Sequence, residues 1–87
     1  MEANKRFYLN PVDSRKSFYN KCYVEVEHDG SLSLYSYNTL VARFVNGRIV
    51  RKWQDYSTTT MRHINAFVAY CGVDGGGKKW WDSLEVE

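Results

Sequence analysis

The stretch LVARFVNGRIVRKW, residues 40–53, decides the predicted fold. Apolar and polar residues alternate on both sides of Asn46-Gly47, and both turn residues accept the positive φ angles of a type I′ turn. The stretch therefore predicts a β-hairpin with Phe44 opposite Ile49 and Leu40 opposite Trp53. We expect this face to point inward. The other face is expected to carry Arg43, Arg48 and Lys52 among Val41, Val45 and Val50.

A second hairpin is predicted upstream, over residues 22–36. Residues 22–27 alternate cleanly between apolar and polar side chains, and a three-residue loop ending at Gly30 follows them. Glycine suits the left-handed third position of such a loop. This loop pairs Val24 with Leu34, whereas a two-residue turn would shift the register by one and bury the wrong side chains.

Residues 57–71 predict the single long helix. Ser57 or Thr58 can serve as the N-cap, because its hydroxyl oxygen can accept a backbone N–H of the first turn. Gly72 stands where a left-handed C-cap residue is needed. Apolar residues recur at steps of three and four along one face: Met61, Ile64, Phe67, Val68 and Cys71.

The remaining segments complete a single domain over residues 1–87. Residues 1–21 are expected to be irregular, apart from a short edge strand at Phe7–Leu9 that ends before Pro11. Gly75–Gly77 are expected to form a flexible joint, followed by a helical turn and a last strand over residues 78–87. The predicted fold is α+β: an antiparallel sheet of four or five strands, a hairpin meander, packed on one helix in two layers.

Composition narrows the function classes only slightly. The net charge of +2 does not by itself indicate a nucleic-acid-binding protein. Two cysteines, Cys22 and Cys71, are too few for a disulfide framework, and we expect reduced thiols in a cytosolic protein. The first residues lack the apolar core of a signal peptide, and we find no stretch long enough to span a bilayer. We therefore expect a cytoplasmic location and no membrane partner.

The clearest chemical pattern is the hydroxyl run Ser57–Thr60 next to His63. Thr59 and His63 are four residues apart on the predicted helix, but no third group is evident to orient the imidazole. We expect His63 to be a partly buried residue that ties the helix to a strand. The histidines and cysteines lack metal-ligand spacing, and Gly75–Lys79 lacks the spacing of a phosphate loop. We predict no catalytic, metal or cofactor site and no enzyme.

The basic hairpin face is the most suggestive surface. It could be an ordinary solvated face, a site for a protein partner, or a track for nucleic-acid phosphates with tyrosines stacking on bases. One of the two adjacent tryptophans could also be exposed as an interface residue. The predicted partner-binding residues are Arg43, Arg48, Arg51, Lys52, Tyr35, Tyr37 and Trp81.

Several motifs resemble a group of small uncharacterised proteins encoded by phages and prophages. They are Tyr35-Ser-Tyr-Asn-Thr39, Tyr56-Ser-Thr-Thr-Thr60 with His63-Ile64 and Phe67, and the ending Lys78-Lys-Trp-Trp-Asp-Ser-Leu-Glu-Val86. The likeness covers roughly residues 32 to 87, and Leu40 departs from it where proline is commoner. The resemblance implies a mobile-element origin and lends no activity.

These observations lead to three functional hypotheses. The first is a non-enzymatic accessory protein that binds a host protein or protein–nucleic acid complex, such as a defence nuclease, and inhibits it by occlusion in the manner of an anti-CRISPR protein. The second is a small nucleic-acid-binding module that uses the basic hairpin face. The third is a small enzyme or nucleotide-sequestering protein. A homodimer is compatible with each.

Overall fold

The computed structural model describes residues 5–10, 21–55 and 57–87. The predicted irregular segment, residues 1–21, lies mostly outside the described residues, because 1–4 and 11–20 are not described, whereas the predicted edge strand near Phe7 is confirmed. Within the described residues the elements are, in chain order, β1 (Lys5–Tyr8), β2 (Cys22–Val26), β3 (Leu32–Ser36), β4 (Thr39–Val45), β5 (Arg48–Arg51), α1 (Thr58–Cys71) and α2 (Lys78–Ser83).

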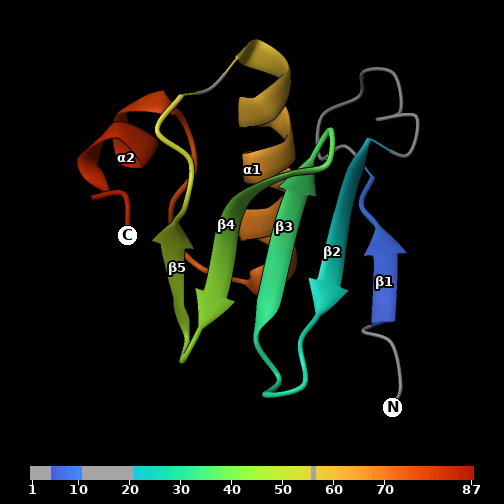
Figure 1. The fold of residues 1–87 in the computed structure, drawn as a ribbon. Coiled ribbons are helices and arrows are strands. Elements are labelled where there is room, and N and C mark those ends of the chain that lie inside the picture. The colour runs from blue at the N-terminus through green and yellow to red at the C-terminus, as the bar shows by residue number, and fades with distance from the viewer. Residues whose placement is uncertain (1–4, 11–20, 56) are drawn as a thin grey trace.

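The sheet is an antiparallel meander, because each strand pairs with the next one along the chain. Among the described strands the order is β1-β2-β3-β4-β5, and α1 packs across one face of the sheet (Figure 1). This arrangement confirms the predicted two-layer α+β fold. Neither described helix lies over the opposite face, which we call the open face.

The first hairpin has the predicted register and loop. Val24 pairs with Leu34, and Gly30 has a φ angle of 89° in the third loop position. The Asp29 carboxylate accepts hydrogen bonds from the Ser31 N–H at 2.9 Å and from the Ser31 hydroxyl at 2.6 Å. These bonds stabilise the loop locally, which is a common use of aspartate in turns.

The second hairpin also forms at the predicted turn. Asn46-Gly47 have φ angles of 53° and 82°, and Phe44 pairs with Ile49. The predicted pairing of Leu40 with Trp53 is wrong. Strand β5 already ends at Arg51, and Trp53 is 41% exposed.

A β-bulge in β4 changes which side chains point inward. Leu34 pairs with Ala42, but Tyr35 pairs with Leu40, so Val41 is an extra residue on its strand. Val41 is 1% exposed and belongs to the core, although the simple alternation had placed it on the outer face. Leu40 shares the open face with its partner Tyr35 instead of pointing inward. A bulge shifts alternation in this way because two residues oppose one.

Helix α1 begins and ends as predicted. The Ser57 hydroxyl accepts the Thr60 N–H at 3.1 Å, and Gly72 ends the helix with a φ angle of 71°. The face turned toward the sheet is wider than the predicted stripe, because it also includes His63 and Ala66. The buried residues of the helix are His63, Ile64, Ala66, Phe67 and Val68.

The glycine run adopts a defined loop between the two helices, with a positive φ angle at each glycine. A Cβ atom on Gly75 would lie 2.6 Å from the Trp80 ring, so this indole needs a glycine beside it. The Asn65 side chain accepts the Gly77 N–H at 2.9 Å and fixes the start of α2 against α1. Trp81, which follows, is fully buried in the core.

The end of the chain runs beside β5 without forming a strand. A single parallel bridge joins Val86 to Arg51, and the Glu87 N–H donates to the Arg51 carbonyl at 2.8 Å. The predicted final strand is therefore reduced to one bridge.

Candidate functional site

A row of tyrosines crosses the open face at the end of the sheet where β1 finishes. The register places Tyr8 opposite Tyr23 and Tyr23 opposite Tyr35. The rings of Tyr23 and Tyr35 are stacked, with centroids 5.1 Å apart and planes at 9°. Tyr8 meets Tyr23 edge-on at 6.0 Å. Paired side chains on neighbouring strands share a face, so the three rings form one continuous aromatic surface.

The tyrosines differ in how far they are available to a partner. Tyr8 is 50% exposed, whereas Tyr23 is 7% exposed. The Tyr23 hydroxyl donates to the Asn38 side chain at 2.8 Å, so the central ring is held by this hydrogen bond as well as by stacking on Tyr35. Tyr35 is half-buried, and its burial raises the pKa of the phenol, so its hydroxyl stays protonated and neutral at physiological pH.

Two arginines share the open face with the tyrosine row: Arg6 lies against its central ring, and Arg43 lies closer to the loop at Gly30. The Arg6 guanidinium sits 4.3 Å above the Tyr23 ring and pairs with Glu25 at 2.7 Å. Arg43, on β4, donates to the hydroxyls of Ser31 at 2.6 Å and Ser33 at 3.3 Å. Both guanidinium groups are therefore held in place, which lowers the entropy cost of presenting them to a partner.

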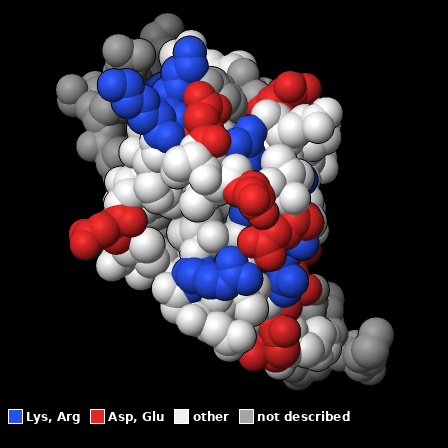
Figure 2. Space-filling view, turned by 90° about the vertical axis from the view of Figure 1, so that its left-hand side faces the viewer, with Lys and Arg blue, Asp and Glu red and all other residues white. Residues whose placement is uncertain are grey.

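The charge on the β5 side is more balanced than the sequence alone indicated. Arg48 pairs with Glu87 at 3.2 Å, and this contact holds the pKa of the Glu87 carboxyl below its usual range. Lys52 continues the alternation of β5 onto the open face and is half-buried. Figure 2 shows the side of the molecule on which β5 and α2 lie, where basic and acidic side chains are interspersed.

Two of the predicted partner-binding residues are buried, and that part of the prediction is wrong. Trp81 is 0% exposed, and Arg51 is 7% exposed. Arg51 shares the inner face of β5 with Ile49, and its guanidinium donates to backbone carbonyls around α2, including that of Trp81 at 2.9 Å. It also lies 4.9 Å from the Trp81 ring. These two residues stabilise the C-terminal segment and cannot contact a partner directly.

Tyr37 is exposed, but it is separated from the tyrosine row. It lies in the two-residue turn between β3 and β4, and its ring is 5.7 Å from that of His63 on the helix side. The open face thus brings together Tyr35, Arg43, Arg48 and Lys52 from the predicted set, with Arg48 paired to Glu87. It also contains Arg6 and Tyr8, which the prediction omitted. Alternation along β1 puts both on one face, but only the pairing of β1 with β2 brings them beside Tyr23.

His63 has the structural role that was predicted. Its side chain is fully buried, and its Nδ1 lies 2.7 Å from the Ser36 hydroxyl on β3. Burial, with a smaller contribution from Arg62, lowers the pKa of the imidazole to about 4. Because this imidazole is fully enclosed, it cannot contact a substrate in this conformation and does not act as a general base beside the hydroxyl run Ser57–Thr60.

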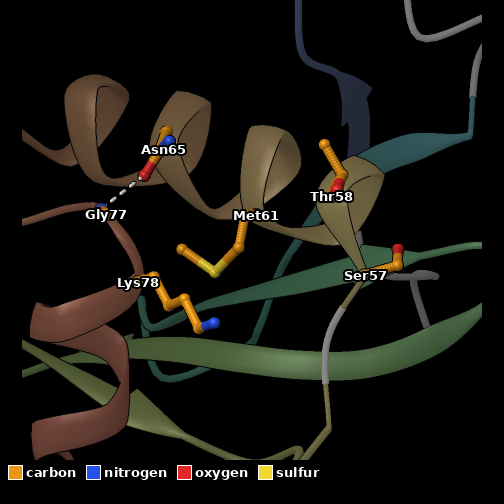
Figure 3. A pocket seen from close by; sticks show the side chains of 6 residues that line it. All are labelled: Ser57, Thr58, Met61, Asn65, Gly77 and Lys78. Carbon is orange, nitrogen blue, oxygen red and sulfur yellow. Dashed lines mark hydrogen bonds between the residues drawn. The ribbon is translucent and has the colours of Figure 1, made fainter.

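A separate groove opens between α1 and the start of α2, with a volume of about 480 Å³. Figure 3 shows the side chains of Met61 and Lys78 approaching each other in it, with Asn65 bonded to Gly77 at one end. Its lining residues are Ser57, Thr58, Met61, Asn65, Gly77 and Lys78. These groups can form hydrogen bonds with a ligand, but they include no carboxylate, thiol or imidazole that would transfer a proton.

Among the described residues, no three His, Cys, Asp or Glu side chains gather closely enough to hold a metal ion. In the same part of the chain, neither helix combines the length and apolarity required to cross a bilayer. Cys22 and Cys71 are free thiols, and burial raises their pKa values to about 12 and about 11. Such thiols are poor nucleophiles.

Comparison with known proteins gives a family and no activity. No curated protein and no solved structure shows a significant match. One family model matches residues 7–83, a span that runs from β1 to α2. The chain therefore belongs to the family of unknown function DUF8033.

Proposed function

We propose that this chain is a non-enzymatic protein that binds a partner protein through its open face. The observation that carries the proposal is the tyrosine row Tyr8–Tyr23–Tyr35, with Arg6 fixed against its central ring and Arg43 fixed further along the same face. Tyrosine and arginine are enriched at the energetically dominant positions of protein interfaces. A rigid aromatic surface with pre-oriented guanidinium groups binds with a smaller loss of conformational entropy than a flexible one.

The geometry favours a protein over a nucleic acid. A phosphate-binding surface needs several uncompensated cations, because affinity for nucleic acid comes largely from neutralised phosphates. Here Arg6 is paired with Glu25, Arg48 is paired with Glu87, and Arg51 is buried. Base stacking would also need accessible ring faces, whereas the rings of Tyr23 and Tyr35 stack on each other.

The biological setting is proposed from the resemblance to small phage proteins. In that setting the chain acts in the host cytoplasm and inhibits a host defence protein, for example a nuclease complex, by covering a functional site. Occlusion requires only a stable interface and no chemistry. This fits a chain in which His63 is enclosed in the core.

The proposal is tested by recovering the partner from host lysate with the wild-type chain and with three variants. Tyr35→Ser and Arg43→Ser remove open-face groups, and Tyr37→Ser is the matched control, because this exposed tyrosine lies on the helix side of its turn. We expect the wild type and Tyr37→Ser to recover a partner protein in stoichiometric amount. The open-face variants should recover at least about tenfold less of this partner.

Two results would count against the proposal. One is recovery of the same partner by all four proteins in equal amounts, which would place the interface elsewhere. The other is recovery of nucleic acid with an affinity that falls steeply as salt is raised, which would favour the nucleic-acid module instead.

A further inference from the structure

Strand β1 is an edge of the sheet formed by the described strands, and its hydrogen-bonding pattern shows which backbone groups face outward. The Leu9 N–H donates to the Cys22 carbonyl at 3.0 Å, so this pair is hydrogen-bonded. Such pairs alternate along an antiparallel ladder. It follows that Phe7 also bonds to β2, whereas the N–H and C=O groups of Arg6 and Tyr8 point away from it. No described residue pairs with them, so they can accept another strand.

An apolar groove runs along the helix side of this edge. It has a volume of about 440 Å³, and its lining residues are Phe7, Tyr8, Leu9, Asn10, Ala66, Ala69 and Tyr70. The two alanines of α1 leave space opposite β1, and Phe7 and Tyr70 border it with ring centroids 5.1 Å apart. The lining residues carry no charge. An edge strand beside a groove under a helix is the arrangement in which extended peptides are bound by strand addition.

We infer that β1 captures an extended segment of the partner protein as a sixth strand, with alternate side chains of that segment in the groove. This inference rests on the proposed function and names the mode of contact. The segment should be apolar at the positions that face Ala66 and Ala69. It should carry an acidic residue near Lys5, which is exposed and shares the groove side of β1 with Phe7. A second copy of this chain is a poorer occupant, because its own β1 would bring a second Lys5 and no acidic residue.

The test uses a displayed library of random short peptides, selected against the folded chain. We expect enriched peptides with alternating apolar residues and one acid, and their affinity is then measured by fluorescence anisotropy. Tyr8→Pro removes an outward N–H without removing a bond to β2, and Ala69→Leu fills the groove from an exposed helix position. Each variant should bind the peptides at least about tenfold more weakly, while Tyr37→Ser, outside both the groove and the tyrosine row, binds them as the wild type does.

Circular dichroism verifies that each variant is folded, and amide hydrogen exchange on the wild type provides a readout that does not depend on mutation. Added peptide should slow the exchange of the Arg6 and Tyr8 amides. The inference is overturned if no peptide is enriched although the chain recovers a protein partner, which would leave the proposed function standing. It is also overturned if peptides bind Tyr8→Pro and Ala69→Leu like the wild type. Sedimentation showing that the chain dimerises with protection of the same amides would assign the edge to a second copy.

Discussion

Replacing Arg51 with alanine is expected to destabilise the fold by about 3 kcal/mol, although the sequence makes this residue look like one more surface cation. Its guanidinium donates to the carbonyls of Trp53 at 2.9 Å, Trp81 at 2.9 Å and Leu84 at 3.3 Å, and it also donates to that of Gln54. Trp53 and Gln54 are exposed, so water can replace the arginine at their carbonyls after the substitution.

The loss comes mainly from the buried contacts. The hydrogen bond to the Trp81 carbonyl is buried, and an orphaned buried acceptor costs about 1–3 kcal/mol. The guanidinium also lies 4.9 Å from the Trp81 ring, a cation–π contact that contributes about 1 kcal/mol. For a domain of this size the total stability is about 5–12 kcal/mol, so Arg51→Ala should still fold but with a much smaller margin.

Urea denaturation followed by tryptophan fluorescence measures the effect. With a typical slope of about 1–2 kcal/mol per molar urea, the midpoint should fall by roughly 2 M. Arg51→Lys should lie between alanine and the wild type, because an ammonium group cannot reproduce the planar fork of donors. Arg48→Ala is the matched control from the same strand, and its midpoint should stay close to that of the wild type. Equal midpoints for Arg51→Ala and Arg48→Ala would refute the assigned role of Arg51.

Three further substitutions test other parts of the fold. Gly75→Ala should lower the melting temperature more than Gly47→Ala, because both glycines have positive φ but only Gly75 meets the Trp80 ring at 2.6 Å; equal shifts would contradict this. Ser57→Ala should cost about 1 kcal/mol of unfolding free energy through loss of the N-cap, and an unchanged value would show that the cap contributes nothing. His63 has a pKa of about 4 when folded and about 6.5 when unfolded, so the unfolded chain binds more protons between these values. Stability should therefore fall by up to about 3 kcal/mol as pH drops from 6.5 toward 4, and His63→Gln should lose this dependence; a variant with the same pH profile would contradict it.

Local patterns in the sequence predicted much of the fold. The Asn46-Gly47 turn, the three-residue loop ending at Gly30 and the helix between Ser57 and Gly72 depend on backbone preferences of a few adjacent residues. The register of the first hairpin followed from the need to bury one set of alternating side chains. Such features are encoded within about ten residues, which is why no long-range information was needed to predict them.

The errors concern contacts between distant segments. The bulge at Val41 interrupts the alternation of β4, and the three consecutive apolar residues Leu40, Val41 and Ala42 do not by themselves show which of them points inward. Arg51 can lie on the inner face because carbonyl groups of the α2 segment accept hydrogen bonds from its guanidinium. This segment comes about thirty residues later in the chain. Which of Trp80 and Trp81 is buried likewise depends on how α2 packs against the rest of the fold, since two adjacent helical residues point in directions about 100° apart.

The candidate surface was predicted only in part for a related reason. Tyr35, Arg43 and Lys52 follow from the alternation of their own strands, whereas Arg6 and Tyr8 join them only through pairing of β1 with β2. Pairing also decides which cations are neutralised, because Glu25 and Glu87 come from other segments than the arginines they contact. A local count of charges along the chain could not foresee this.

Hydroxyl-radical footprinting of the chain with and without its recovered partner tests the docking surface most directly. Bound partner should protect Tyr8 and Tyr35 from oxidation while Tyr37 and Trp53, exposed elsewhere, keep their reactivity. Unchanged oxidation of Tyr8 and Tyr35 in a saturated complex, or protection confined to the groove between the two helices, would contradict the account.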